Sequence, residues 1–271
     1  MSRAGMNGAD LNGAGLNGAR VLVLGGARLA RVLADALADA GAEVTYSLAG
    51  VTDAPRLPAR VAVRVRTGGF GGAEGLAAWL KAREIDLLAD ATHAFARNMP
   101  RQAARAARMA GVAALRVMPP ALDVPEGLQV TRVADESAAA EVVAQGARVF
   151  AALGSRGLAA LRHRDDLRLR GRAIMPPAFA LPPRWRVVVG DAVLPPESPE
   201  EELANLRAAG AEWLILRESG TRAARNLLLA ARKLGLRVVL IARPAAPAGV
   251  PVAHSVHEVL AALRRLSARP R

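Results

Sequence analysis

From residue 20 onward, short apolar runs alternate with segments of helical periodicity. The run Arg20–Leu24 ends in two glycines, and the next segment, Ala27–Ala40, repeats its aliphatic side chains with the spacing of an amphipathic helix that ends at Gly41. Near-continuous apolar strands between such helices are typical of parallel strands covered by helices on both faces. In sheets of this kind, ligands bind at the carboxyl ends of the strands.

The same alternation continues through the first half of the chain. It predicts strands over 20–24, 43–47, 61–65, 85–91 and 112–117, with helices over 27–40, 73–83 and 97–110. A proline-containing stretch, 119–127, interrupts the pattern and is interpreted as a linker.

After the linker the alternation starts again. It predicts strands over 128–133, 147–153, 185–189, 211–216 and 237–242, with helices over 135–145, from 154 onward, and over 199–209, 223–234 and 255–266. The predicted fold class is therefore α/β, with two Rossmann-like, doubly wound parallel-sheet domains and a cleft between them. We expect a first domain over 20–118 and a second over 128–271. Residues 1–19, which contain a glycine-rich five-residue repeat, are expected to form a flexible tail.

The composition narrows the range of functions. The chain has 271 residues and no cysteine, which excludes disulfides and thiolate metal sites. It lacks an apolar run long enough to span a bilayer and an apolar signal segment, so a cytoplasmic protein without membrane association is expected. A monomer or small homo-oligomer is expected.

The net charge of +13 does not indicate nucleic-acid binding. All but two of the 37 basic residues are arginine, they are dispersed along the chain, and aromatic residues make up only 3% of it. Nucleic-acid binders more often gather basic residues into one stripe and interleave aromatics. The positive field still favours anionic small molecules as ligands.

Two glycine-rich turns follow predicted strands. Gly25 and Gly26 precede a helix, where backbone N–H groups can approach a phosphate, although a tight turn explains these glycines equally well. The loop Gly68–Gly72 surrounds Phe70 with four glycines, which indicates either close backbone approach to a ligand or a flexible connection.

Polar residues also follow the predicted strand 85–91. Asp90, Thr92 and His93 lie where an α/β sheet places its ligand, and His93 is a candidate acid or base, although Thr92 or His93 capping the next helix is the simpler interpretation. That helix carries a basic stripe, interpreted as a polycarboxylate-binding wall or as a solvated face: Arg97, Arg101, Arg105 and Arg108.

Two further groups have alternative interpretations. The cluster between Arg162 and Arg172 has the same two interpretations as the stripe. The pair His254 and His257 has a spacing found in helical metal sites, but a surface helix start is preferred, and no metal is expected.

Several segments together resemble the precorrin-6A reductase family of cobalamin biosynthesis. The residues that carry the resemblance lie in order over 20–262: VLVLGG at 21–26, YSLAG at 46–50, GGFGGAEGL at 68–76, DATHAFA at 90–96, the segments 116–120 and 154–158, and VVLIARP at 238–244. The segments 68–76 and 90–96 are the most specific.

The resemblance implies hydride transfer from NADPH to a carbon–carbon double bond of the precorrin-6A macrocycle, giving precorrin-6B. It implies cofactor contacts from Gly25, Gly26, Ala27, Arg28, Ser47, Gly68, Gly69, Phe70, Gly71, Thr92, Ser219 and Gly220. It implies contacts to the polycarboxylate tetrapyrrole from Arg97, Arg101, Ser155 and Arg156, with His93, or a water that it holds, as the proton donor. Val51 stands where the family has an arginine, and Arg28 could replace that arginine at a phosphate.

One alternative is a non-catalytic member of the same fold that binds a tetrapyrrole or a nucleotide. The departures at 27–29, 51 and 217–221 favour it, whereas the intact segments 68–76 and 90–95 oppose it.

Overall fold

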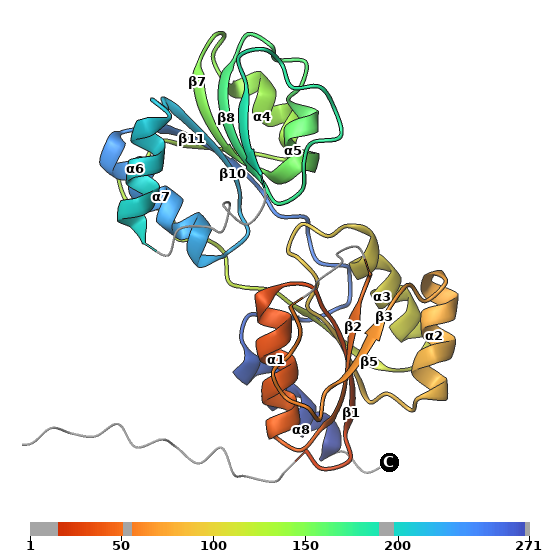
Figure 1. Cartoon of the computed structure of the whole chain (residues 1–271). Helices are drawn as coiled ribbons and strands as arrows, with labels where there is room; N and C mark the ends of the chain where they lie inside the picture. Colours follow the sequence, from red (N-terminus) through yellow and green to blue (C-terminus); the bar gives the residue numbers. More distant parts are fainter. Residues whose placement is uncertain (1–15, 51–55, 190–197, 269–271) are drawn as a thin grey trace, which may run out of the picture. The chain divides into compact units, whose positions relative to one another are not determined.

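The computed structural model describes residues 16–50, 56–189 and 198–268 (Figure 1). The first two copies of the repeat, residues 6–15, and Val51 therefore lie outside the described residues. The chain divides into two compact units: unit 1 extends to Pro119 and resumes at Ala245, and unit 2 runs from Pro120 to Pro244. Each unit contains one six-stranded sheet whose strands all pair in parallel. The predicted fold class, two Rossmann-like α/β domains, is confirmed.

The sheet of unit 1 has the strand order β12-β5-β4-β1-β2-β3. Its strands are β1 (Arg20–Leu24), β2 (Glu43–Leu48), β3 (Arg64–Thr67), β4 (Leu87–Asp90), β5 (Ala113–Val117) and β12 (Val252–Ala253). Its helices are α1 (Arg28–Asp39), α2 (Gly72–Ala82), α3 (Asn98–Ala110) and α8 (Val256–Ser267).

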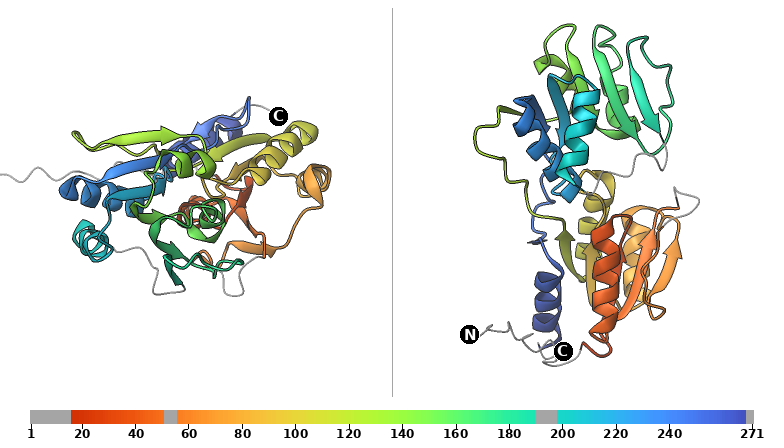
Figure 2. Two further views of the ribbon diagram at one scale, coloured as in Figure 1. Left: turned by 90° about the horizontal axis from the view of Figure 1, so that it is seen from above. Right: turned by 60° about the vertical axis from the view of Figure 1, so that its left-hand side comes forward.

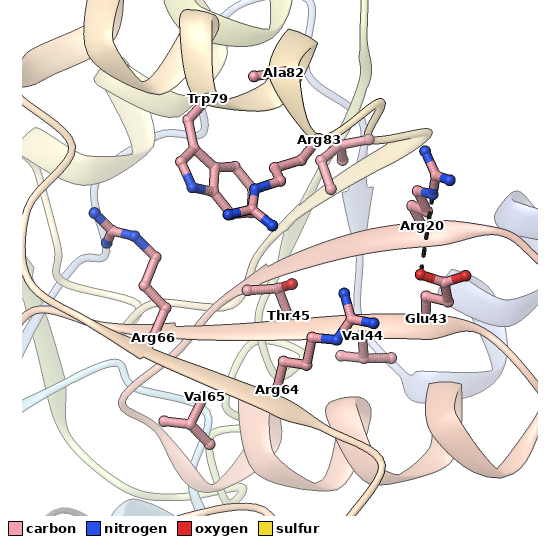
Figure 3. A pocket seen from close by; sticks show the side chains of 11 residues that line it. Arg20, Glu43, Val44, Thr45, Arg64, Val65, Arg66, Trp79, Ala82 and Arg83 are labelled. Carbon is pink, nitrogen blue, oxygen red and sulfur yellow. Dashed lines mark ion pairs between the residues drawn. The ribbon is translucent and has the colours of Figure 1, made fainter.

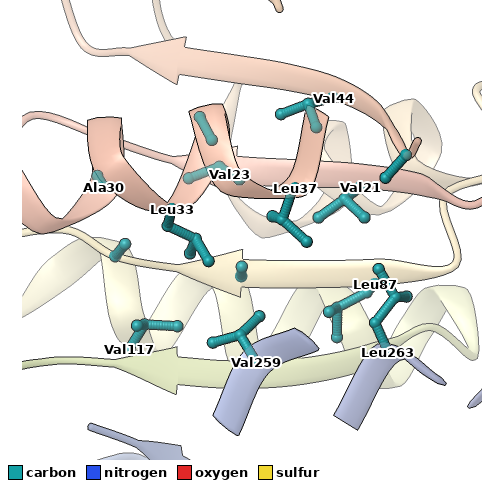
Figure 4. Close-up of a cluster of buried hydrophobic side chains, with 14 of the residues drawn as sticks. Val21, Val23, Ala30, Leu33, Leu37, Val44, Leu87, Val117, Val259 and Leu263 are labelled. Carbon is teal, nitrogen blue, oxygen red and sulfur yellow. The ribbon is translucent and has the colours of Figure 1, made fainter. Parts of the chain in front are cut away.

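Helices cover both faces of this sheet. Helices α1 and α8 lie on one face, where Leu33, Leu37, Val259 and Leu263 are fully buried against apolar strand residues (Figure 4). Helices α2 and α3 cover the other face and bury Leu76 and Leu80 against β1 and β4. Burial of both strand faces explains why the strands are apolar at nearly every position.

The sheet of unit 2 has the order β6-β11-β10-β7-β8-β9. Its strands are β6 (Val130–Val133), β7 (Arg148–Ala152), β8 (Arg168–Ala173), β9 (Arg186–Val189), β10 (Trp213–Arg217) and β11 (Arg237–Ile241). Its helices are α4 (Glu136–Val142), α5 (Gly154–Ala160), α6 (Pro199–Ala208) and α7 (Arg222–Leu234). Helices α6 and α7 share one apolar cluster with β10 and β11, while α5 contacts β8 and α4 contacts β11.

The chain returns to unit 1 after it completes unit 2, which corrects the predicted boundary of 128–271. After β11 the chain leaves unit 2, and Val252 and Ala253 pair with Arg116 and Val117 of β5 in unit 1. Helix α8 then packs beside α1 (Figure 2). Because Val259 and Leu263 complete the core under α1, the last segment belongs to the first unit and not to the second.

The end of the predicted tail is also ordered. Leu16 is buried, its N–H donates to the carbonyl of Ala40, and Ala19 joins the same core cluster. The expectation of a flexible segment is therefore wrong for residues 16–19, because an apolar side chain there finds a place under the end of α1.

Two strands have no counterpart in the predicted pattern. Strand β8 reads RLRGRA, and its arginines hide the alternation that buries Leu169 and Ala173. Strand β12 has only two residues. The strand predicted over 61–65 is found three residues later, as β3.

Among the described helices, none has the length and hydropathy to cross a bilayer.

An arginine closes the end of α4 in unit 2. Arg164 donates to the carbonyl oxygens of Ala140, Val143 and Ala144, and its Nε and Nη2 donate to the carboxylate of Asp166 at 2.8 and 2.9 Å. Asp166 also accepts the N–H of Gly146 at 2.8 Å. The hydrogen bond from Arg164 is the main cause that holds the pKa of Asp166 well below its usual value.

Replacing Leu263 by alanine should lower the stability of unit 1 by about 2–4 kcal/mol, since it leaves a cavity in a fully buried site. Hydrogen exchange followed by mass spectrometry should become faster in β1, β5 and β12 and stay unchanged in β7 and β10. Arg265→Ala, on an exposed position of the same helix, is the matched control. Faster exchange in unit 2 instead would contradict the assignment of α8 to unit 1.

Asp166→Asn should destabilise unit 2 in a pH-dependent manner. The pKa of Asp166 is lower in the folded protein than in the unfolded chain, where it is about 3.9. The ionised carboxylate therefore contributes its full stabilisation of the folded state above that pH, and this contribution decreases as the pH falls below it. Urea unfolding should show a difference from the wild type of about 1–2 kcal/mol at neutral pH that narrows toward pH 3. Asp165→Asn, at the exposed neighbouring position, is the matched control and should leave the free energy of unfolding at neutral pH nearly unchanged.

Candidate functional site

The predicted cofactor residues of unit 1 follow the carboxyl ends of neighbouring strands. Strands β1 and β4 are adjacent, with β2 and β3 on one side and β5 on the other, so the direction of winding reverses between β1 and β4. Such a reversal is where open α/β sheets bind ligands. Gly25–Arg28 follow β1, Ser47 is near the end of β2, Gly68–Gly71 follow β3, and Thr92 and His93 follow β4.

Tyr46 organises the turn between β1 and α1. The N–H of Gly25 donates to the carbonyl of Ser47 at 2.8 Å, and the N–H of Gly26 donates to the hydroxyl of Tyr46 at 3.0 Å. A Cβ on Gly25 would lie 2.3 Å from the Tyr46 ring, whereas one on Gly26 would meet nothing within 4 Å. Gly25 is therefore required by internal packing, and the open side of the turn is at Gly26, whose φ is +123°.

Arg66 organises the glycine loop after β3. Its Nη1 and Nη2 donate to the carbonyls of Gly68 and Gly69, both at 2.5 Å, and Nη1 lies 3.4 Å from Oγ of Ser47. The guanidinium stacks on Phe70 with 3.7 Å between Cζ and the ring centroid, and the ring of Trp79 contacts Phe70 edge-on. Phe70 is thus held by internal contacts, while Gly68 and Gly69 have open space beside them.

A buried ion pair lies at the ends of β4 and β5. Arg116 is 2% exposed and Asp90 is 4% exposed, and Nη1 lies 3.2 Å from Oδ1. Arg116 also donates to the carbonyls of Asp90, Thr92 and His93 at 2.9–3.0 Å. Oδ1 of Asp90 accepts from the N–H and the hydroxyl of Thr92 at 3.1 and 2.6 Å.

His93 is exposed beyond this pair. Its Nδ1 accepts the N–H of Phe95 at 3.2 Å, so the neutral ring carries its hydrogen on Nε2. Arg97 occupies the N-cap position of α3, and Arg101 lies one turn further, both exposed. Arg105 of the same stripe pairs with Glu74 of α2.

The predicted residues of unit 2 gather at the carboxyl edge of its own sheet. Ser155 and Arg156 follow β7, and Ser219 and Gly220 follow the adjacent strand β10. The hydroxyl of Ser155 donates to the carbonyl of Met175, and the hydroxyl of Ser219 bonds that of Thr221 at 2.9 Å. Arg156 is exposed.

Other predicted groups have structural partners. Nδ1 of His254 lies 3.2 Å from the carbonyl of Met118, and Ser255 caps α8 in a reciprocal arrangement with Glu258. This arrangement agrees with the helix-start interpretation of the pair His254 and His257.

A large hollow lies elsewhere in unit 1. It has a volume of about 600 Å³ and lies between α2 and the amino-terminal part of β2 and β3, lined by Arg64, Arg66, Arg83 and Trp79 among others (Figure 3). Most of its guanidinium groups have internal partners: Arg20 pairs with Glu43 and Glu84, Arg66 bonds the glycine loop, and Arg83 lies over Trp79. None of the predicted site residues is in its lining.

Sequence reasoning missed Tyr46, Arg66 and Arg116. Arg116 has a signal in the sequence, because a single charge inside the apolar run 112–118 must find a buried partner. Tyr46 acts on Gly25 and Gly26, which only the pairing of β1 with β2 brings beside it. Arg66 acts within its own segment, on the carbonyls of the glycines two and three residues further along the chain.

The chain is similar in sequence to known proteins of one family over most of its length. The family model of the precorrin-6x reductase CbiJ/CobK matches residues 20–264. The precorrin-6A reductase of Mycobacterium tuberculosis is 39% identical over 239 residues, which cover 88% of this chain and 94% of that protein. The enzyme of Rhodococcus erythropolis is 37% identical over 246 residues, covering 90% and 96%.

A solved structure agrees over the whole fold. The structure of CobK precorrin-6A reductase superposes with a TM-score of 0.82 at 34% sequence identity and covers 93% of this chain and 99% of that chain. The family predicted from the segments 21–26, 68–76 and 90–96 is confirmed: the chain belongs to the precorrin-6x reductase CbiJ/CobK family of oxidoreductases.

Proposed function

We propose that the chain uses NADPH to reduce a carbon–carbon double bond of precorrin-6A, giving precorrin-6B. Family membership supports the reaction, and one observation on the chain itself supports the cofactor. At the reversal between β1 and β4, the turn 25–28 leaves an open side and enters a helix whose N-terminal N–H groups have no side-chain cap. An anionic pyrophosphate fits that place.

The residues of this turn fit the cofactor in three ways. Ala27 is the N-cap of α1 and supplies no side-chain cap, the first turn contains no acidic residue, and a Cβ on Gly26 would meet nothing within 4 Å. The N–H groups around Ala27 and Arg28 are therefore available to phosphate oxygens, with the helix dipole adding to their attraction. Gly68 and Gly69, also open, would accept the adenosine half near the ends of β2 and β3.

We attribute the preference for NADPH over NADH to Arg66, with Arg28 as a second cation. Arg66 holds its guanidinium beside Ser47 and the glycine loop, at the end of the sheet where a dinucleotide places its adenosine ribose. A fixed guanidinium is suited to a phosphate because its donors match phosphate geometry. Arg28, exposed in the first turn of α1, adds positive charge on the same edge.

The macrocycle carries many carboxylates, and the chain presents cations for them. In unit 1, Arg97 and Arg101 are exposed on successive turns of α3, close in sequence to His93. In unit 2, Arg156 is exposed at the carboxyl edge beside Ser155. Guanidinium groups of this kind are suited to binding and orienting a polycarboxylate.

Bound NADPH supplies the hydride, and the chain must deliver a proton to the neighbouring carbon. If a charged His93 gave its Nε2 proton directly to the macrocycle, the remaining hydrogen would be on Nδ1. That N–H would then face the N–H of Phe95, which now donates to Nδ1. Of the two possible roles for His93, the geometry therefore favours the one in which Nε2–H orients a water that protonates the macrocycle.

The purified protein should oxidise NADPH when precorrin-6A is added and produce a macrocycle two mass units heavier, because one hydride and one proton are added. Absorbance at 340 nm and mass spectrometry measure the two quantities together. NADPH should bind more tightly than NADH in the same titration. Binding of NADPH without consumption would favour the non-catalytic alternative, and tight, salt-sensitive binding of DNA would favour a nucleic-acid-binding function.

Gly69→Val should weaken NADPH binding by roughly tenfold or more without loss of stability, since its side chain would enter the space assigned to the cofactor. Gly69 does not adopt a positive φ, and a Cβ added to it would meet nothing within 4 Å, so the position has room for a side chain. Gly69→Ala should have a smaller effect. Calorimetric titration measures the affinity, and an unchanged affinity in a protein of unchanged melting temperature would remove Gly69 from the site.

A further inference from the structure

The turn that carries His93 has no regular secondary structure. Residues 91–97 lie between β4 and α3, and within this turn the carbonyl of His93 accepts the N–H of Ala96 at 2.8 Å. Half-buried carbonyls need donors, and each further donor restricts the conformations that a turn can adopt. The additional donors to residues 90–93 come from outside the turn.

Arg116 supplies the donors from the neighbouring strand. Its position on β5 is in register with Asp90 on β4, and the two side chains meet at the carboxyl end of the sheet. Nη1 reaches the carbonyls of Asp90 and Thr92 at 2.9 and 3.0 Å, and Nη2 reaches that of His93 at 2.9 Å. One planar guanidinium thus fixes the carbonyls of three residues in the segment 90–93.

Asp90 fixes the same turn from the other side. Its Oδ1 accepts from the N–H and the hydroxyl of Thr92 while it pairs with Arg116. The carbonyl and N–H of Thr92 are therefore both held by this pair. The next fixed point is Nδ1 of His93, which accepts the N–H of Phe95. The contacts form a continuous series from β5 to the imidazole.

We propose that Arg116 and Asp90 are positioning residues that set the orientation and tautomer of His93. The pair is buried and acts through the backbone of residues 90–93. A buried ion pair is costly for stability alone, but it can specify one geometry. Here the bonds of the carboxylate are all made by Oδ1, while Oδ2 of Asp90 is buried without a hydrogen-bond partner among the described residues. The consequence for the reaction rests on the proposed function of His93.

Arg116→Lys tests this proposal because it keeps the positive charge and removes the planar guanidinium group. An ammonium carries its three donors on one nitrogen and cannot reproduce the two nitrogen positions from which Arg116 donates. We expect kcat to fall by about 10- to 100-fold, because the water held by His93 is displaced, with the Kd for NADPH changed by less than about twofold. Arg265→Lys, an exposed position of unit 1 on α8, is the matched control and should leave both quantities unchanged.

A second readout does not depend on activity. In protein with ¹⁵N-labelled histidine and no substrate, the His93 signals, assigned with His93→Gln, should report one tautomer with hydrogen on Nε2. In Arg116→Lys they should shift toward a mixture of tautomers. If Arg116→Lys does not fold, Asp90→Asn replaces it, since it keeps an oxygen acceptor for Thr92 and removes the charge.

The outcomes separate the two proposals. Lower stability with an unchanged His93 tautomer and unchanged kcat would overturn the positioning role. If the wild-type protein binds NADPH but does not reduce precorrin-6A, the proposed function fails, and the tautomer measurement still decides whether Arg116 and Asp90 orient His93.

Discussion

All strands of each sheet run in the same direction, and the placement of the chemistry follows from this constraint. Parallel strands bring every carboxyl end to one edge, so the polar residues that follow β1, β2, β3 and β4 meet although they are far apart in sequence. Parallel strands also need helical crossovers on both faces, which forces the strands to be apolar. The few polar side chains inside them, such as Asp90 and Arg116, must then pair with each other.

The position of one edge strand makes unit 1 depend on a distant part of the chain. Both sheets follow the same doubly wound strand order, but they differ in where the chain supplies one edge strand. In unit 1 this edge strand is β12, which comes after the whole of unit 2 in the sequence. In unit 2 the equivalent edge strand is β6, which comes before the other strands of that unit. The chain therefore crosses between units twice, near Pro119 and near Pro244. Unit 2 is one continuous segment, but unit 1 completes its sheet and the core under α1 only after unit 2 has been synthesised.

Much of this fold can be predicted from the sequence because buried parallel strands leave a local signal. The pattern predicts the strands at Arg20–Leu24 and Arg237–Ile241 to within one residue. It misses β8 because that strand alternates arginine with leucine or small residues, and β12 because two residues carry no period. The membership of α8 is missed for a different reason: amphipathicity shows that a helix packs on a sheet, but not which of two similar sheets it covers.

The candidate site, like the fold, can be predicted from the sequence only in part. Glycines and polar residues after strands are visible in the sequence, but the side chains that give them their conformation are not marked by that pattern. Tyr46 and Arg116 lie on strands next to those that Gly25 and Thr92 follow, and Arg66 lies at the end of the strand that precedes Gly69. Two of these three are arginines that bind several carbonyls at once, as Arg164 does at the end of α4. A lysine has three donors on a single nitrogen, so it cannot place two donor nitrogens in one fixed plane as a guanidinium does. The high arginine content, which as net charge indicates little about function, therefore includes residues that hold the turns of the candidate site in place.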